Sequence, residues 1–208
     1  MLQKVTDIQP QKKREGYYSI FVDDQYSFSL SELDLSVAKL HIGDQINKDR
    51  LLELQKLSQQ SKMYSRAIYY LRFGPRTVWQ MQEYLVRKAN FDPEEIMPVL
   101  QRLQSDGYLD DKAYIDAYIN SRQLSRPRSK RQLQAELMKK GIGSTLIHSS
   151  LEKLDNKSQK DAAAKIVRKK KQISRFQDEQ KLTEYMLRQG FPYALVKEVL
   201  AEVNSETS

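Results

Sequence analysis

The hydrophobic pattern of the first 60 residues differs from that of the rest of the chain. Apolar and polar residues alternate over 26–30, where Tyr26, Phe28 and Leu30 share one face, and residues 17–22 are aromatic and β-branched. These features predict two strands joined by a short loop at 23–25, with residues 5–8 as a third strand. Helical segments follow at 31–40 and 48–58. Because a three-stranded sheet alone is marginally stable, we expect a helix to cover its apolar face.

From residue 61 the apolar residues have helical spacing, and they recur as one template in three copies. After the first residue of each copy, apolar side chains follow at +5, +9 and +12, which places them on one helix face. The copies are offset by 51 and then 49 residues. We predict that these positions form the core of each repeat: Phe91, Ile96, Leu100, Leu103, Ile142, Ile147, Leu151, Leu154, Phe191, Val196, Leu200 and Val203.

The residues between the apolar positions indicate where helices end. Gly141 and Gly190 precede the template and suit left-handed C-caps, whereas the first copy has Ala89 at that place and Asn90 as an inserted residue. Pro93 suits the first turn of the next helix. Pro98 falls inside that predicted helix and should kink it or shift its start.

A further helical segment precedes the template in each copy, at 63–72, 111–122 and 160–175, so each repeat is predicted to contain three helices. The predicted fold is mainly α, with a small β-containing N-terminal domain at 1–60 and tandem three-helix repeats at 61–106, 107–156 and 157–208. Repeats of this period are typical of arrays, so we expect an elongated, curved stack.

Composition adds an electrostatic asymmetry. The chain has 35 Lys and Arg against 27 Asp and Glu, a net charge of +8. Residues 1–60 hold 8 basic and 9 acidic side chains, whereas residues 61–208 hold 27 and 18. Two acid-free runs, 122–131 and 165–175, are the densest. A solvated helix face would explain either run alone, but two of them favour a surface for nucleic acid or an acidic partner. The candidate binding residues are Arg122, Arg126, Arg128, Lys130, Arg131, Lys165, Arg168, Lys169, Lys170, Lys171 and Arg175.

Residues for catalysis are few. The chain has no cysteine, two isolated histidines and no glycine-rich phosphate loop, so we expect neither an enzyme nor a cofactor or metal site. Asp110 and Asp111 could hold Mg²⁺, although a role at a helix start explains them better. We expect Trp79 to lie in the core rather than to stack on bases. No apolar run is long enough to span a membrane, and the first residues do not resemble a signal peptide.

Several motifs carry a family resemblance. They are Gly107-Tyr-Leu-Asp-Asp111 followed by Ala113-Tyr114, Glu136-Leu-Met-Lys-Lys-Gly-Ile142, the segment from Ser65-Arg-Ala67 to Leu71, and Arg188-Gln-Gly-Phe191. Together they resemble the RecX family of RecA regulators over about residues 61–204, and the β-rich front resembles the N-terminal extension of RecX proteins from Gram-positive bacteria.

The resemblance implies a function and a partner. RecX-like proteins are non-enzymatic and cytoplasmic, bind the RecA–ssDNA filament, and mainly inhibit its recombinase, ATPase and coprotease activities in DNA repair and recombination. We therefore expect a cytoplasmic monomer that contacts the RecA nucleoprotein filament, with single- or double-stranded DNA as a further direct partner. A stand-alone helical DNA-binding protein is the main alternative, and a metal-dependent nuclease is a third reading.

Overall fold

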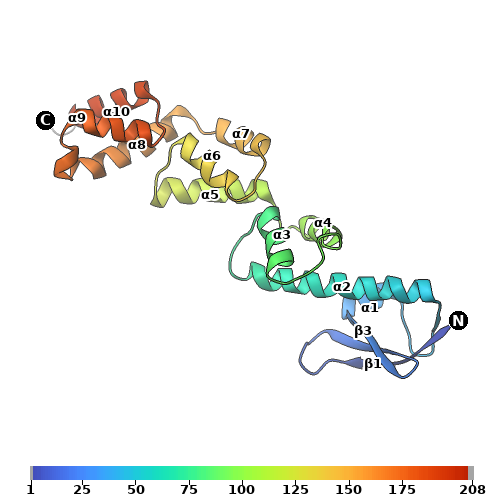
Figure 1. Cartoon of the computed structure of the whole chain (residues 1–208). Coiled ribbons are helices and arrows are strands. Elements are labelled where there is room, and N and C mark those ends of the chain that lie inside the picture. Colours follow the sequence, from blue (N-terminus) through green and yellow to red (C-terminus); the bar gives the residue numbers. More distant parts are fainter. Residues whose placement is uncertain (1, 206–208) are drawn as a thin grey trace. The chain divides into compact units, whose positions relative to one another are not determined.

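A computed structural model describes residues 2–205 (Figure 1). The chain divides into two compact units, which we describe separately. Unit 1 comprises Met1–Gly74 and Met81–Tyr108, and unit 2 comprises Pro75–Gln80 and Leu109–Ser208. Within residues 2–205 the chain is mostly helical, with one antiparallel sheet near its start, as predicted.

The sheet in unit 1 has four strands in the order β3-β2-β1-β4. They are β1 (Gln3–Pro10), β2 (Tyr17–Val22), β3 (Gln25–Ser31) and the short β4 (Gln45–Ile46), which the sequence pattern did not reveal. Asp23 and Asp24 form the hairpin turn with φ of 49° and 64°. Two left-handed residues are what a tight two-residue hairpin requires, and Asp tolerates that conformation.

A helix covers the apolar face of this sheet, as expected. Leu54 of α2 (Lys48–Leu71) is buried with Val5, Ile20, Phe28 and Leu30. The prediction of separate helices at 48–58 and 63–72 was wrong, because α2 is continuous over 24 residues. The intervening residues contain no glycine or proline, so nothing in the backbone interrupts the helix.

The first repeat continues with α3 (Val78–Arg87), whose first three residues belong to unit 2 and the rest to unit 1, and with α4 (Met97–Ser105) in unit 1. Pro98 lies in the first turn of α4, where its missing N–H costs nothing, so it shifts the helix start rather than kinking the helix. Pro93 therefore precedes the helix, contrary to the prediction. Asn90 has φ of +58° and directly precedes Phe91, so Asn90, not Ala89, replaces the glycine of the other copies.

A polar contact ties the short helix α1 (Glu32–Ala38) to α4 within unit 1. Nη1 of Arg102 lies 3.3 Å from Oδ1 of Asp34, whose side chain is buried. The same guanidinium lies 4.5 Å from the ring centroid of Tyr64, and the Tyr64 hydroxyl donates to Asp106 at 2.7 Å. Burial, followed by this hydrogen bond, raises the pKa of Tyr64 well above its usual value. The sheet region and the first repeat thus share one packed unit.

Unit 2 contains the second and third repeats. The second repeat has α5 (Asp111–Ser125), α6 (Lys130–Met138) and α7 (Ser144–Glu152). The third has α8 (Asn156–Lys171), a 3₁₀ turn at Ser174–Phe176, α9 (Glu179–Arg188) and α10 (Tyr193–Ser205). Asp155 caps α8, so this helix begins four residues earlier than the predicted segment at 160. The division into four domains remains our proposal. The boundary that it places at residue 60 falls within α2.

Two equivalent junctions link successive three-helix elements inside unit 2. The Thr77 hydroxyl donates to the carbonyl of Lys140 at 2.7 Å and accepts from the N–H of Gln80 at 3.1 Å. The Ser129 hydroxyl likewise donates to the carbonyl of Gln189 at 2.6 Å and accepts from the N–H of Gln132 at 3.2 Å. Each hydroxyl therefore caps one helix and also binds the next repeat.

Close backbone approach accompanies each junction. Gly141 has φ of +77°, and a Cβ placed on it would lie 2.1 Å from Cγ of Trp79. Gly190 has φ of +86°, and its Cβ would lie 2.9 Å from Cβ of Arg131. Trp79 is 44% exposed and packs at this junction, so the prediction that it lies in the core was wrong. Glycine is therefore needed here for conformation and for space.

The residues predicted as repeat cores occupy interior positions with two partial exceptions. Phe91 and Leu154 are half-buried, and the other ten are buried. In the second repeat, Ile142, Ile147 and Leu151 pack with Leu133 and Leu137. In the third, Phe191, Val196, Leu200 and Val203 form one cluster with side chains of α8 and α9.

Candidate partner-binding site

Part of the first basic run has an internal structural role. Nε of Arg122 lies 3.0 Å from Oε2 of Glu136, and Nε of Arg128 lies 2.9 Å from its Oε1. The Tyr118 hydroxyl donates to the same carboxylate at 2.6 Å. All three charged side chains are about 28% exposed. These contacts hold the loop between α5 and α6 against the body of the repeat, so Arg122 and Arg128 are not fully available to a partner.

The environment of Glu136 keeps it ionised. Burial alone would raise the pKa of Glu136, but hydrogen bonds from Tyr118 and Arg128 and the charge of Arg122 outweigh burial and lower it below 4.5. Burial and the hydrogen bond to Glu136 together raise the pKa of Tyr118. At neutral pH the carboxylate therefore carries its full charge between the two arginines.

The remaining cations of the first run differ in exposure. Arg126 follows the last residue of α5, and its side chain is exposed. Lys130 begins α6, and its backbone N–H donates to the side chain of Gln159 at 2.9 Å. Arg131 packs over Gly190 at the second junction. Arg126 and Arg131 are thus the exposed cations of this run, and of the two only Arg131 packs at a junction.

The second run lies on α8 and the turn that follows it. Four of its cations are exposed: Lys165, Arg168, Lys169 and Arg175. Lys170 lies 4.8 Å from the ring centroid of Tyr185, and Lys171 donates to the side chain of Asn204. The cluster of cations in the last turn of α8 also interacts favourably with the negative end of the helix dipole.

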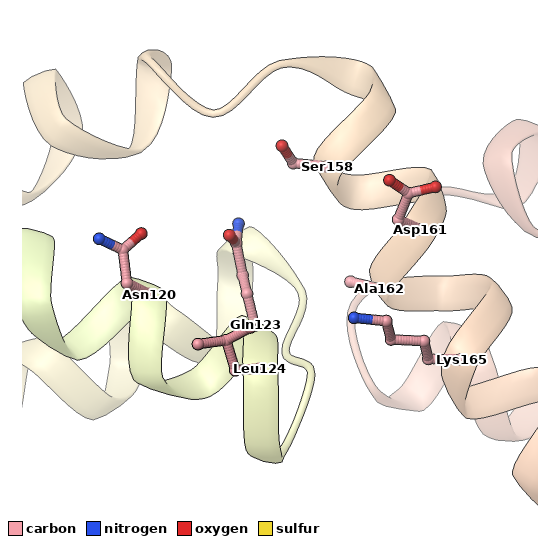
Figure 2. Close-up of a pocket in the computed structure, with 7 residues that line it drawn as sticks. All are labelled: Asn120, Gln123, Leu124, Ser158, Asp161, Ala162 and Lys165. Atoms are coloured by element: carbon pink, nitrogen blue, oxygen red, sulfur yellow. The ribbon is translucent and has the colours of Figure 1, made fainter.

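A groove between α5 and α8 brings the two runs together within unit 2. Figure 2 shows its lining side chains, which come from both helices. The groove has a volume of about 420 Å³ and is lined by Asn120, Gln123, Leu124, Ser158, Asp161, Ala162 and Lys165. Arg126 lies two residues beyond Leu124, and Lys169 lies one helical turn beyond Lys165. One exposed cation of each run, Arg126 and Lys169, therefore lies close in sequence to its lining.

The groove has a polar, an apolar and a basic part. Asp161 and Ser158 lie toward the start of α8, and Lys165 lies one turn later. Leu124 is 81% exposed, more than any other large apolar side chain among residues 2–205, and Ala162 is buried. Nε2 of Gln123 is buried and has no hydrogen-bond partner within residues 2–205. Such a site can accept an apolar group with a hydrogen-bond acceptor or an anion beside it.

The sequence predicted the charges around this groove but not most of its lining. The exposure of Leu124 could have been predicted from the sequence, because Leu124 lies off the helical stripe that buries Ile115 and Ile119 in α5. The roles of Ser158, Asp161 and Ala162 depend on how two repeats pack. Spacing within one repeat therefore gives no sign of them.

Asp110 and Asp111, the two candidate Mg²⁺ ligands, make hydrogen bonds at the starts of helices. Asp110 caps α5 by accepting from the N–H groups of Lys112 and Ala113 at 2.8 and 2.9 Å. Asp111 accepts from the N–H of Val78 at 2.9 Å. Across residues 2–205, no three His, Cys, Asp or Glu side chains gather as a metal site would require. In the same range, no helix is both long and apolar enough to cross a membrane.

The fold and this groove define a class of protein: tandem three-helix repeats behind a small N-terminal sheet, with a groove between helices as candidate site. Comparison with known proteins narrows the class. Residues 3–47 match the model of the regulatory protein RecX N-terminal domain. Residues 64–103 and 110–151 match the first and second three-helix domains of RecX.

Relatives match along nearly the whole chain. The regulatory protein RecX of Streptococcus gordonii is 30% identical over 207 residues, which cover 98% of this chain and 78% of the relative. That of Bacillus licheniformis is 29% identical over 207 residues, covering 97% and 78%. A crystal structure of regulatory protein RecX superposes with a TM-score of 0.82 at 26% identity, covering 96% of this chain and 100% of the other. The chain belongs to the RecX family of regulatory proteins.

Proposed function

We propose that this protein binds the RecA–ssDNA filament and modulates it, mainly by inhibiting its recombinase, ATPase and coprotease activities, without catalysing a reaction of its own. Membership of a family of regulatory proteins supports a regulatory role. The RecA filament as the target follows from the resemblance of the motifs at 107–114 and 136–142. On this proposal the protein acts in the cytoplasm, as a monomer, in DNA repair and recombination.

One observation carries the proposal: residues of both acid-free runs line a single groove in unit 2, Gln123 and Leu124 from the first run and Lys165 from the second. A filament presents the same protomer surface and DNA backbone again and again. Tandem repeats suit such a target, because several weak contacts made together bind far more tightly than any one of them. We propose that the tandem repeats contact successive positions along the filament. Binding of this kind needs no catalytic pocket.

The test compares filament binding by two double variants. Arg126→Glu with Lys169→Glu reverses one exposed charge of each acid-free run, and we expect roughly tenfold weaker binding to RecA–ssDNA–ATP filaments. Lys153→Glu with Lys197→Glu makes the same change in net charge at exposed positions outside both runs, and should bind like wild type. Equal affinity of all three proteins at low and high salt would contradict the proposal.

Arg128 is unsuitable for this test. Its reversal would place a second carboxylate against Glu136, from which Arg128 now lies 2.9 Å away. Like charges at that distance repel, so a loss of binding would reflect lost stability. Arg126 makes no such internal ion pair among the described residues, which lets binding be measured apart from folding.

The alternative, a stand-alone DNA-binding protein, makes a different prediction. Such a protein would bind bare duplex DNA tightly and with sequence preference, without RecA. Titration against duplex DNA, bare ssDNA and RecA–ssDNA–ATP filaments separates the two functions. Preferred binding to the filament together with reduced ATP hydrolysis supports the regulator. Mg²⁺-dependent cleavage of the DNA would instead indicate a nuclease.

A further inference from the structure

The groove between α5 and α8 has features that charge alone does not explain. Leu124 exposes 81% of its surface beside the buried Ala162, although surrounding residues are polar. Nε2 of Gln123 is buried without a partner in the described part of the chain. A buried donor of this kind is unfavourable until an acceptor reaches it. These features together indicate that another molecule completes the site.

The lining favours a segment of protein over nucleic acid. The groove residues include no aromatic ring on which a base could stack. Asp161 lies inside the groove, where it would repel the closely spaced charges of a phosphate backbone, whereas a peptide can place its carboxylate at Lys165 and an uncharged group at Asp161. Lys165, one turn away, is exposed and has no ion-pair partner among residues 2–205. An apolar surface flanked by one cation can bind an aliphatic side chain and a neighbouring carboxylate of one peptide.

We infer that this groove binds a short acidic segment of the protein partner. An aliphatic side chain of that segment packs against Leu124 and Ala162, and a neighbouring carboxylate pairs with Lys165. Rotation of the Gln123 side chain would bring Nε2 out of its buried position to a backbone carbonyl of the segment. The exposed Arg126 and Lys169 lie close in sequence and attract the acidic segment at longer range. The inference rests on the proposed function, which makes RecA the partner.

Two single variants test the two halves of the site. Leu124→Ala removes the apolar contact, and we expect about tenfold weaker binding to RecA–ssDNA–ATP filaments, as for the loss of a buried Leu side chain. Lys165→Glu should weaken binding by about the same factor at low salt, and this loss should become smaller at high salt, whereas the loss in Leu124→Ala should not. Because both positions are exposed at the surface, neither variant should alter the unfolding transition.

Matched controls make the same substitutions elsewhere in unit 2. Leu187→Ala changes an exposed Leu of α9, and Lys197→Glu reverses an exposed Lys of α10; neither residue lines the groove. Both controls should bind filaments like wild type. If the groove variants bind as tightly as their controls while wild type still binds and inhibits, the groove inference is wrong and the proposed function stands. If wild type does not bind filaments at all, the proposed function fails first.

Cross-linking identifies what lies in the groove. The chain has no cysteine, so Asn120→Cys creates a unique thiol on the groove wall for a benzophenone label. Irradiation of the labelled full-length protein on RecA–ssDNA–ATP filaments should yield cross-links to one acidic, aliphatic-containing RecA peptide, identified by mass spectrometry. Cross-links to the oligonucleotide in place of RecA would overturn the inference and assign the groove to DNA. The inference would also be overturned if Leu124→Ala and Lys165→Glu lost as much affinity for bare ssDNA as for filaments.

Discussion

Replacing Gly141 with alanine tests the first repeat junction, because a matched control exists in the same chain. Gly141 and Gly107 both have φ of +77°. A Cβ on Gly107 would meet no atom within 4 Å, whereas a Cβ on Gly141 would lie 2.1 Å from Cγ and 2.3 Å from Cβ of Trp79. The two substitutions therefore impose the same backbone strain, and only one of them also creates a steric overlap.

The expected free energies follow from this difference. A left-handed alanine costs about 1–2 kcal/mol, which is the whole expected effect of Gly107→Ala. Gly141→Ala adds an overlap with Cβ of Trp79, an atom fixed by the backbone, so the start of α3 must move away. Overpacking of this kind costs about 1–3 kcal/mol more. The movement also strains the hydrogen bond from Thr77 to the carbonyl of Lys140.

Two readouts check the prediction. Urea unfolding followed by circular dichroism gives the free energy of unfolding of each variant. The chain contains one tryptophan, so fluorescence emission reports on Trp79 alone. Gly141→Ala should shift that emission under native conditions, and Gly107→Ala should leave it unchanged. Equal destabilisation by the two variants, with unchanged emission in both, would refute the assignment of this contact as a structural junction.

Two further predictions concern unit 2. Ser129→Ala should destabilise unit 2 by about 2 kcal/mol, because it removes a helix cap and leaves the carbonyl of Gln189 without its 2.6 Å hydrogen bond. Ser125→Ala, at an exposed position, is the control, and equal unfolding curves for the two variants would contradict a role of Ser129 at the junction. The pKa of Glu136 is lowered in the folded protein, so its contribution is present above about pH 4.5 and is lost as the pH falls through the lowered value. Glu136→Gln should thus be less stable than wild type at neutral pH and lose less stability on acidification to about pH 3, as measured by denaturant titration; parallel losses would argue against the ion pairs.

Much of the fold could be predicted because hydrophobic periodicity is a local property. The strand at 17–22 coincides with β2, and the template at +5, +9 and +12 marked the buried face of one helix in every repeat. Local patterns gave a wrong helix boundary where no glycine or proline marks one. Residues 59–62 were expected to separate two helices, yet they contain no breaker and α2 runs through them.

The candidate site was harder to predict than the fold, for a physical reason. Charge runs are visible in sequence, but whether a cation pairs internally depends on distant residues. Arg126 and Arg128 are equivalent by composition, yet Arg128 meets Glu136 while Arg126 is exposed. The groove lining comes from two repeats, so no single periodicity contains it.

The junctions and the groove both lie in unit 2, and their chemistry separates a structural contact from a binding surface. At each junction a capping hydroxyl meets a carbonyl of the next repeat, and a side chain covers a glycine that has no room for a Cβ. These groups satisfy one another within the chain. In the groove, by contrast, an amide donor, a leucine and a lysine remain unmatched by the described residues. Because Leu124 and Lys165 are exposed and the buried Nε2 of Gln123 lacks an acceptor, a bound segment can add contacts in the groove that the junctions already have, which is the strongest reason to seek the partner's contact there.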